Sequence, residues 1–104
     1  MDAKEKQSML LLQLVMLFQS AALQQMGKLK NPISDKIERD LQQAQISIDM
    51  IEMLHDKTKG NLADEEEKMI SSVLRDLRLN YVDEANKTPQ QPPADAAAGK
   101  EQTP

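Results

Sequence analysis

His55 is the side chain in this sequence most suited to chemistry, because imidazole titrates near neutral pH and binds metal ions. It is the only histidine, and the chain has no cysteine, which excludes disulfides, thiolate ligands and cysteine nucleophiles. A zinc site needs further ligands at helical spacing, but Met50, Ile51 and Lys59 provide none. We therefore expect no metal site and interpret His55 as a packed residue, or as one that complements the negative end of a helix.

The basic string KTKGNL, residues 57–62, raises the question of a phosphate-binding loop. In a P-loop the glycines precede the Lys-Ser/Thr pair and a helix starts directly after it, whereas here the glycine follows. The next helix is also expected to begin with four carboxylates, residues 64–67, which would repel a phosphate. We interpret the string as a structural turn formed by Lys57, Thr58, Gly60, Asn61 and Leu62.

The acidic run Asp64 to Glu67 is a second candidate, for a divalent cation. Successive carboxylates on a helix point in different directions, and the EF-hand spacing is absent. Serine, histidine and acid residues stand in no recognisable catalytic arrangement. We predict a protein that is not an enzyme, with no catalytic residue, no metal and no cofactor.

The composition fits one small globular domain of 104 residues, with 39% hydrophobic and 29% charged residues. A domain of this size buries only roughly 60 to 65% of its unfolded surface, so its stability margin is thin. Phe18 and Tyr81 are the only aromatic residues, and the net charge is −4. Both features disfavour nucleic acid as a partner.

The first predicted helix spans Lys4 to Met26. It is ended by Gly27 as a left-handed cap and by Pro32 beyond it. From Met9 to Phe18 its apolar residues point in nearly every direction around the axis. A helix that is hydrophobic all round is a buried helix. Two further helices cannot enclose it completely, so we expect another polypeptide to cover the rest.

The second predicted helix, Asp35 to Lys57, carries two apolar faces. Asp35 or Ser34 would cap its start, with Glu38 at capping-box spacing from Asp35, and Gly60 would cap its end. One stripe consists of Ile37, Leu41, Ala44, Ile48, Ile51 and His55, and the opposite face of Ile46, Met50 and Met53. Two faces indicate a helix that lies between neighbours.

The third predicted helix starts near Asp64, with Glu67 at capping spacing. Its single apolar stripe consists of Ile70, Val73, Leu74, Leu77 and Tyr81. Asp49, in the most apolar part of the second helix, either faces solvent or pairs with Arg75 or Arg78 of the third and fixes the register. Residues 86–104 are rich in Pro, Ala and Gln without apolar periodicity, which predicts a disordered tail.

Several strings together resemble the small bacterial family catalogued as domain of unknown function 1844. They are IDMIEML at 48–54, KTKGNL at 57–62, EEE at 65–67 and LRDLRLNYV at 74–82, with Met26-Gly27 and Asn31-Pro32 in support. The resemblance covers roughly Ser8 to Asp83. Ala63 departs from it, because the family tends to have a polar cap residue there. The resemblance implies a short helical bacterial protein of the cytoplasm, and no reaction.

Together these features predict an all-α, three-helix bundle, a helical hairpin plus an N-terminal helix. We expect a flexible N-terminus at 1–7, the helical domain at 8–85 and the tail at 86–104. The expected function is that of an interaction or accessory protein whose partner is a second copy of itself, or another protein. The residues expected to make these contacts are Leu10, Leu12, Val15, Met16, Phe18, Ile46, Met50 and Met53.

The alternative is a peripheral membrane protein whose first helix lies in the lipid interface. Glutamines interrupt the apolar run, and few basic residues flank it, so we do not expect a membrane partner. The run Met9 to Phe18 also resembles a signal-peptide core, but the charges of the preceding side chains sum to zero. We therefore expect a cytoplasmic protein.

Overall fold

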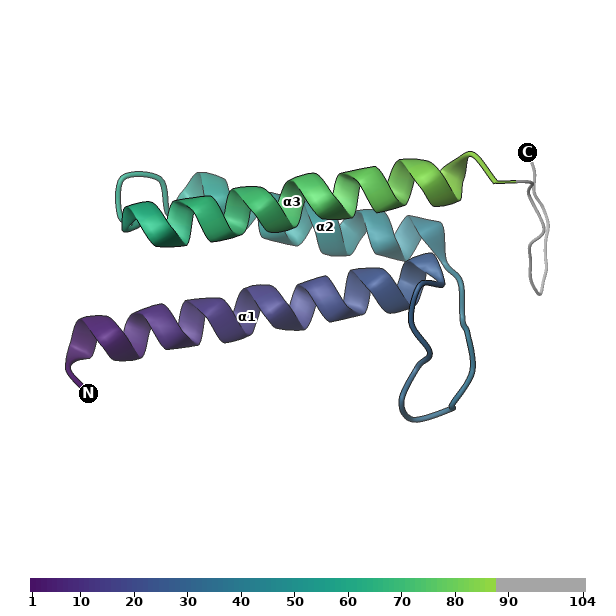
Figure 1. Cartoon of the computed structure of the whole chain (residues 1–104), viewed down its shortest axis with the longest axis horizontal. Helices are drawn as coiled ribbons and strands as arrows, with labels where there is room; N and C mark the ends of the chain where they lie inside the picture. The colour runs from purple at the N-terminus through teal and green to yellow at the C-terminus, as the bar shows by residue number, and fades with distance from the viewer. Residues whose placement is uncertain (88–104) are drawn as a thin grey trace.

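The computed structural model describes residues 1–87, which form three helices (Figure 1). They are α1, Ala3–Met26, α2, Leu41–Lys57, and α3, Asp64–Ala85. α2 and α3 form an antiparallel hairpin, and α1 lies along both of them, antiparallel to α2 (Figure 1). The predicted all-α, three-helix architecture is confirmed. Of the predicted tail, residues 88–104 lie outside the described residues.

α1 starts and ends at strong capping signals. The Asp2 carboxylate accepts a hydrogen bond from the backbone N–H of Glu5 at 2.8 Å, and the Glu5 carboxylate accepts one from the N–H of Asp2 at 3.0 Å. At the other end Gly27 has φ 88°, the left-handed conformation predicted for it. α1 begins at Ala3, one residue before the predicted Lys4, so residues 3–7 of the predicted flexible N-terminus are helical.

The predicted start of α2 at Asp35 is wrong, because residues 27–40 are not helical and α2 begins at Leu41. The side chain of Asn31 accepts the backbone N–H of Ile33 at 2.9 Å, and Asp35 has φ 58°, which no α-helix allows. Asp40 is the cap instead and accepts the N–H of Gln43 at 3.1 Å. Neither Asp35 nor Ser34 caps α2.

This shift also removes one residue from the predicted apolar stripe. Ile37 lies in the connection between α1 and α2 and is 53% exposed. The remaining members follow the prediction, since Ala44, Ile48 and Ile51 are fully buried and Leu41 packs against them.

The turn between α2 and α3 has the predicted residues but different caps. α2 ends at Lys57 and is capped by Thr58, whose N–H and hydroxyl both donate to the carbonyl of Leu54. Gly60 follows with φ 88°. α3 is capped at Ala63 rather than at Asp64. Because alanine has no side-chain acceptor, only the reverse bond of a capping box forms, from the N–H of Ala63 to the Glu66 carboxylate at 2.7 Å.

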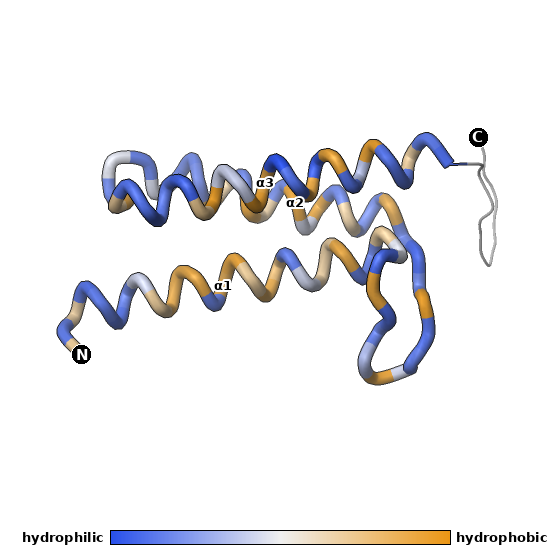
Figure 2. Tube along the Cα trace, in the orientation of Figure 1, coloured by the Kyte–Doolittle hydropathy of each residue, from blue (hydrophilic) through white to orange (hydrophobic). Residues whose placement is uncertain are grey.

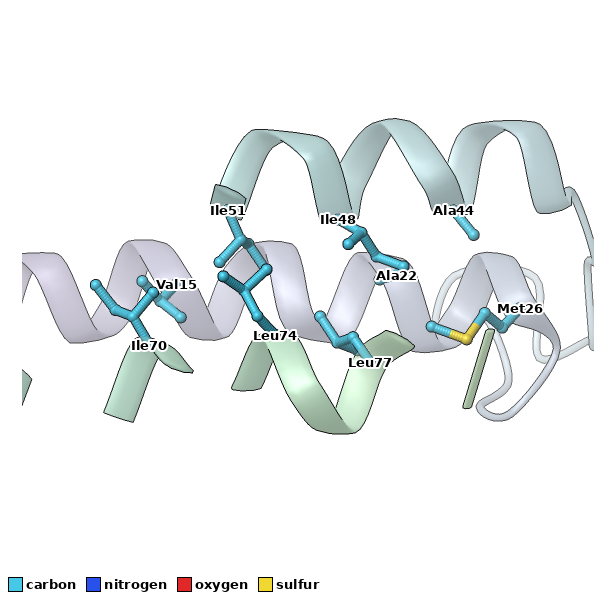
Figure 3. Close-up of a cluster of buried hydrophobic side chains, with 9 residues drawn as sticks. All are labelled: Val15, Ala22, Met26, Ala44, Ile48, Ile51, Ile70, Leu74 and Leu77. Atoms are coloured by element: carbon cyan, nitrogen blue, oxygen red, sulfur yellow. The ribbon is translucent and has the colours of Figure 1, made fainter. Parts of the chain in front are cut away.

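The core lies where the three helices meet (Figure 3). Nine hydrophobic residues are buried there: Val15, Ala22, Met26, Ala44, Ile48, Ile51, Ile70, Leu74 and Leu77. Val73 and Tyr81 are partly buried against them, so the predicted stripe of α3 is confirmed. Each helix contributes one narrow row to this core, which leaves the other apolar rows of α1 outside it.

Candidate interaction surface

α1 carries three apolar rows, of which the hairpin covers one. The covered row is spaced by four and three residues and contains Leu11, Val15, Phe18 and Ala22. Val15 is fully buried in it, and Phe18 is partly buried against the core. The prediction that Val15 contacts a partner is therefore wrong, because α2 and α3 already enclose it.

A second row, Leu10, Leu14 and Leu17, has the same spacing and lies in solvent. These side chains are 53%, 38% and 65% exposed. Gln25 lies on the same side of α1 as Leu14, because eleven residues make about three full helical turns. Its side chain forms a hydrogen bond with the hydroxyl of Ser47 in α2 at 2.7 Å. This contact places the row on the flank of α1 that adjoins α2.

α2 carries exposed apolar residues as well. Met50 lies one helical turn beyond Ser47 and is 40% exposed, and Ile46 and Met53 are 46% and 43% exposed. Leu10, Leu14, Leu17, Ile46, Met50 and Met53 are called the α1–α2 apolar face below. Figure 2 shows hydrophobic residues, in orange, along both α1 and α2.

The expected contact residues thus fall into three places. Leu10, Ile46, Met50 and Met53 belong to the α1–α2 apolar face. Leu12 and Met16 form, with Met9, a separate row on α1 and are 41% and 51% exposed. Val15 and Phe18 pack in the core. Sequence reasoning had not singled out Leu14 and Leu17, although their spacing from Leu10 is visible in the sequence.

By length and composition alone, α1 could cross a membrane. Only 17% of its most apolar 18-residue stretch is buried within the molecule. Its surface, however, is not uniformly apolar. Lys6, Gln13 and Ser20 are spaced by seven residues, so they form one exposed polar line opposite the core row. The line separates the two exposed apolar rows.

A buried charge lies at the end of the molecule where α1 and α3 finish. The carboxylate of Glu84 is 7% exposed and lies 2.9 Å from Lys28 Nζ, 3.3 Å from Arg39 Nε and 2.6 Å from Lys87 Nζ. Burial alone would raise the pKa of Glu84, but hydrogen bonds from Lys87 and Lys28 and the charges of both lysines lower it from 4.5 to about 2. This cluster is structural, and it joins the α1–α2 connection to α3.

The predicted register pair between Asp49 and Arg78 does not form. Arg78 donates to the Glu52 carboxylate at 2.8 Å, while Asp49 is exposed and accepts a hydrogen bond from Gln45 in its own helix. Arg75 contacts the adjacent Asp76. Arg78 therefore does link α3 to α2, but through Glu52, which lies one helical turn after the predicted Asp49.

His55 pairs with a carboxylate of the next helix. Its Nε2 lies 2.6 Å from Glu67 Oε2, and this hydrogen bond, followed by one from Ser71, lowers the pKa of Glu67. Within residues 1–87, no group of three or more potential ligand side chains could hold a metal ion. The pair links α2 to α3 beside the turn.

The predicted structural turn lines a half-open cavity of about 610 Å³ between its backbone and the start of α1. Lys4, Ser8 and Leu11 line it from α1, and Glu66 lines it from α3. The Ser8 hydroxyl donates to Glu66, and this bond, with the one from Ala63, lowers the pKa of the Glu66 carboxyl. Within the cavity, the side chains of Ser8 and Glu66 therefore bind each other and link the start of α1 to the start of α3.

Comparison with known proteins identifies a matching sequence family. The sequence model of the family described as Domain of unknown function (DUF1844) matches residues 8–83. The matched segment includes every residue of the α1–α2 apolar face and the turn between α2 and α3. No curated protein and no solved structure matches the chain.

Proposed function

The chain belongs to the family described as Domain of unknown function (DUF1844), and from that premise we propose that it is a small helical interaction protein of the cytoplasm. It acts through the α1–α2 apolar face, which another polypeptide covers. The observation that carries this proposal is the exposure of six large apolar side chains, between 38% and 65%, on two packed helices.

The free energy at stake is large for so small a domain. Full burial of a Leu, Ile or Met side chain is worth about 1.5 to 3 kcal/mol, so covering six half-exposed ones would contribute roughly 6 kcal/mol. The whole stability of a domain is typically only about 5 to 15 kcal/mol. Exposed apolar surface on this scale is typical of a contact site.

Gel filtration of a fresh extract from the native cells, with antibody detection, tests the proposal. We expect the protein to elute well above the 11.7 kDa of one chain. Leu17→Glu should shift it toward the mass of one chain, because a carboxylate in the contact would lose its hydration. Leu79→Glu is the matched control, since Leu79 is 64% exposed, as against 65% for Leu17, but lies on α3 outside the face. Elution of the unchanged protein as a single chain would contradict the proposal.

The second candidate is a peripheral membrane protein, which the length and apolar composition of α1 favour. The exposed polar line of Lys6, Gln13 and Ser20 argues against it, because lipid would have to contact both apolar rows and the line between them. Flotation with vesicles, with and without anionic lipid, separates the two candidates. Co-migration that survives Leu79→Glu but not Leu17→Glu would favour the membrane.

A further inference from the structure

We propose that the polypeptide covering the α1–α2 apolar face is a second copy of this chain, whose α1 packs antiparallel to the first about a two-fold axis. This inference rests on the proposed function and names its partner. The axis passes midway between Leu14 and Leu17, so the two α1 helices contact each other and each also contacts the flank of the other copy's α2.

The row of α1 is complementary to itself in this arrangement. Leu10, Leu14, Leu17 and Ala21 are spaced by four, three and four residues, which reads the same in both directions. Reversal about the centre places Leu14 opposite Leu17 of the second copy and Leu10 opposite Ala21. Large side chains then meet a small one at each end, and leucines pack in the middle, as facing rows of helical bundles do.

A parallel pair would be less favourable in both packing and charge. It would place each residue opposite its own copy, so that the two small Ala21 side chains would leave a gap. It would also bring Lys6 of the first turn beside the same lysine of the second copy.

The antiparallel pair places this lysine where its charge is favourable. α1 has no basic residue in its last turn, so the negative end of its dipole lacks a complementary charge within the helix. Lys28, the next basic residue, is engaged with Asp83 and Glu84 at 2.8 and 2.9 Å. Antiparallel packing brings Lys6 of the second copy, which is opposite Gln25 in this arrangement, to this end.

The absence of natural cysteine allows a direct test with single-cysteine variants of the full-length chain. In the antiparallel pair, the two copies of residue 10 are separated by eleven residues, or about 16 Å along the axis. Disulfides need Cα atoms within about 7 Å. Leu10→Cys alone and Ala21→Cys alone should therefore not cross-link, whereas an equal mixture of the two should form a mixed disulfide under mild oxidation. Leu79→Cys measures collisional cross-linking.

Sedimentation equilibrium at tens of micromolar accompanies the cross-linking. We expect twice the chain mass for the unchanged protein and for Leu79→Glu, and one chain for Leu17→Glu. A monomeric mass for the unchanged protein and for both variants would contradict the proposal that the partner is a second copy. Cross-linking of Leu10→Cys alone as efficiently as the mixture would overturn the antiparallel arrangement.

These results are separable from those of the proposed function. If the purified protein is a monomer while the native extract contains a larger complex that Leu17→Glu dissolves, the inference fails and the proposed function stands with a different partner. If the protein is a single chain in both experiments, both fail.

Discussion

At the scale of single residues, Glu84 is the most strongly constrained charge in the described part of the chain. Its carboxylate is nearly buried, and its backbone carbonyl also accepts a hydrogen bond from Arg39 at 2.7 Å. Arg39 packs over Gly27 as well, so one side chain joins the end of α1 to the end of α3. The cluster thereby fixes the connection that precedes α2.

Glu84→Gln should lower the free energy of unfolding by roughly 2 to 4 kcal/mol, because it removes the charge that Lys28, Arg39 and Lys87 surround. Urea denaturation at a fixed protein concentration measures this change. Asp83→Asn is the control, since Asp83 is 59% exposed and its removal should change stability by less than about 1 kcal/mol. Equal losses in both variants would contradict the role of burial.

Because of the low pKa of Glu84, we expect the free energy of unfolding to fall in acid. The pKa of Glu84 is about 2 in the folded chain and ordinarily 4.5, so the unfolded chain binds the extra proton between these values. The contribution, at most about 3 kcal/mol, is complete above pH 4.5 and is lost as the pH falls toward 2. Urea denaturation at a series of pH values should show the difference between unchanged protein and Glu84→Gln shrinking over that range. A constant difference would contradict the assignment.

These charge contacts were not predictable from the sequence. Arg39 and Glu84 are 45 residues apart, and nothing in their local pattern pairs them. The sequence predicted that Arg78 pairs with a carboxylate of the second helix, but it named Asp49 and not Glu52. The choice between these two residues depends on how the two helices are rotated about their axes. Periodicity fixes which side a residue occupies, but not the rotation between helices.

At the scale of elements, the sequence predicted the number and order of the helices but misplaced the start of α2. Asp35 and Glu38 have capping spacing by coincidence, and the turn around Asn31 prevents a helix there. Asp40 and Gln43 have the same spacing and are the real signal. Two such signals five residues apart cannot be ranked by local pattern alone, because the contacts of the connection decide between them.

The start of α3 gives an element-scale prediction. Ala63 has the extended backbone of a cap residue, with φ −68° and ψ 157°, but no side-chain acceptor. Ala63→Ser should supply one for a free N–H of the first turn and raise the free energy of unfolding by about 0.5 to 1 kcal/mol. Ala85→Ser, at the other end of α3, should give no gain. Equal effects of the two substitutions in thermal or urea denaturation would contradict a capping mechanism.

At the scale of the whole molecule, the sequence correctly indicated that three helices cannot cover their apolar surface. Leu10 and Met50 remain 53% and 40% exposed, as that reasoning requires, while Val15 is fully buried. The surplus was predictable because it depends only on counting apolar rows. Which row of α1 faces the hairpin was not, because adjacent rows are chemically alike.

If two copies cover this surplus together, stability must depend on protein concentration. Association stabilises only the folded chains, so the thermal midpoint should rise by a few degrees between about 1 and 100 micromolar protein. Leu17→Glu should lower the midpoint at high concentration and abolish the dependence, since it acts on the contact between copies. Leu79→Glu, equally exposed on α3, should retain it. Circular dichroism melts at both concentrations make the comparison, and a midpoint independent of concentration in the unchanged protein would show that each chain folds without a second copy.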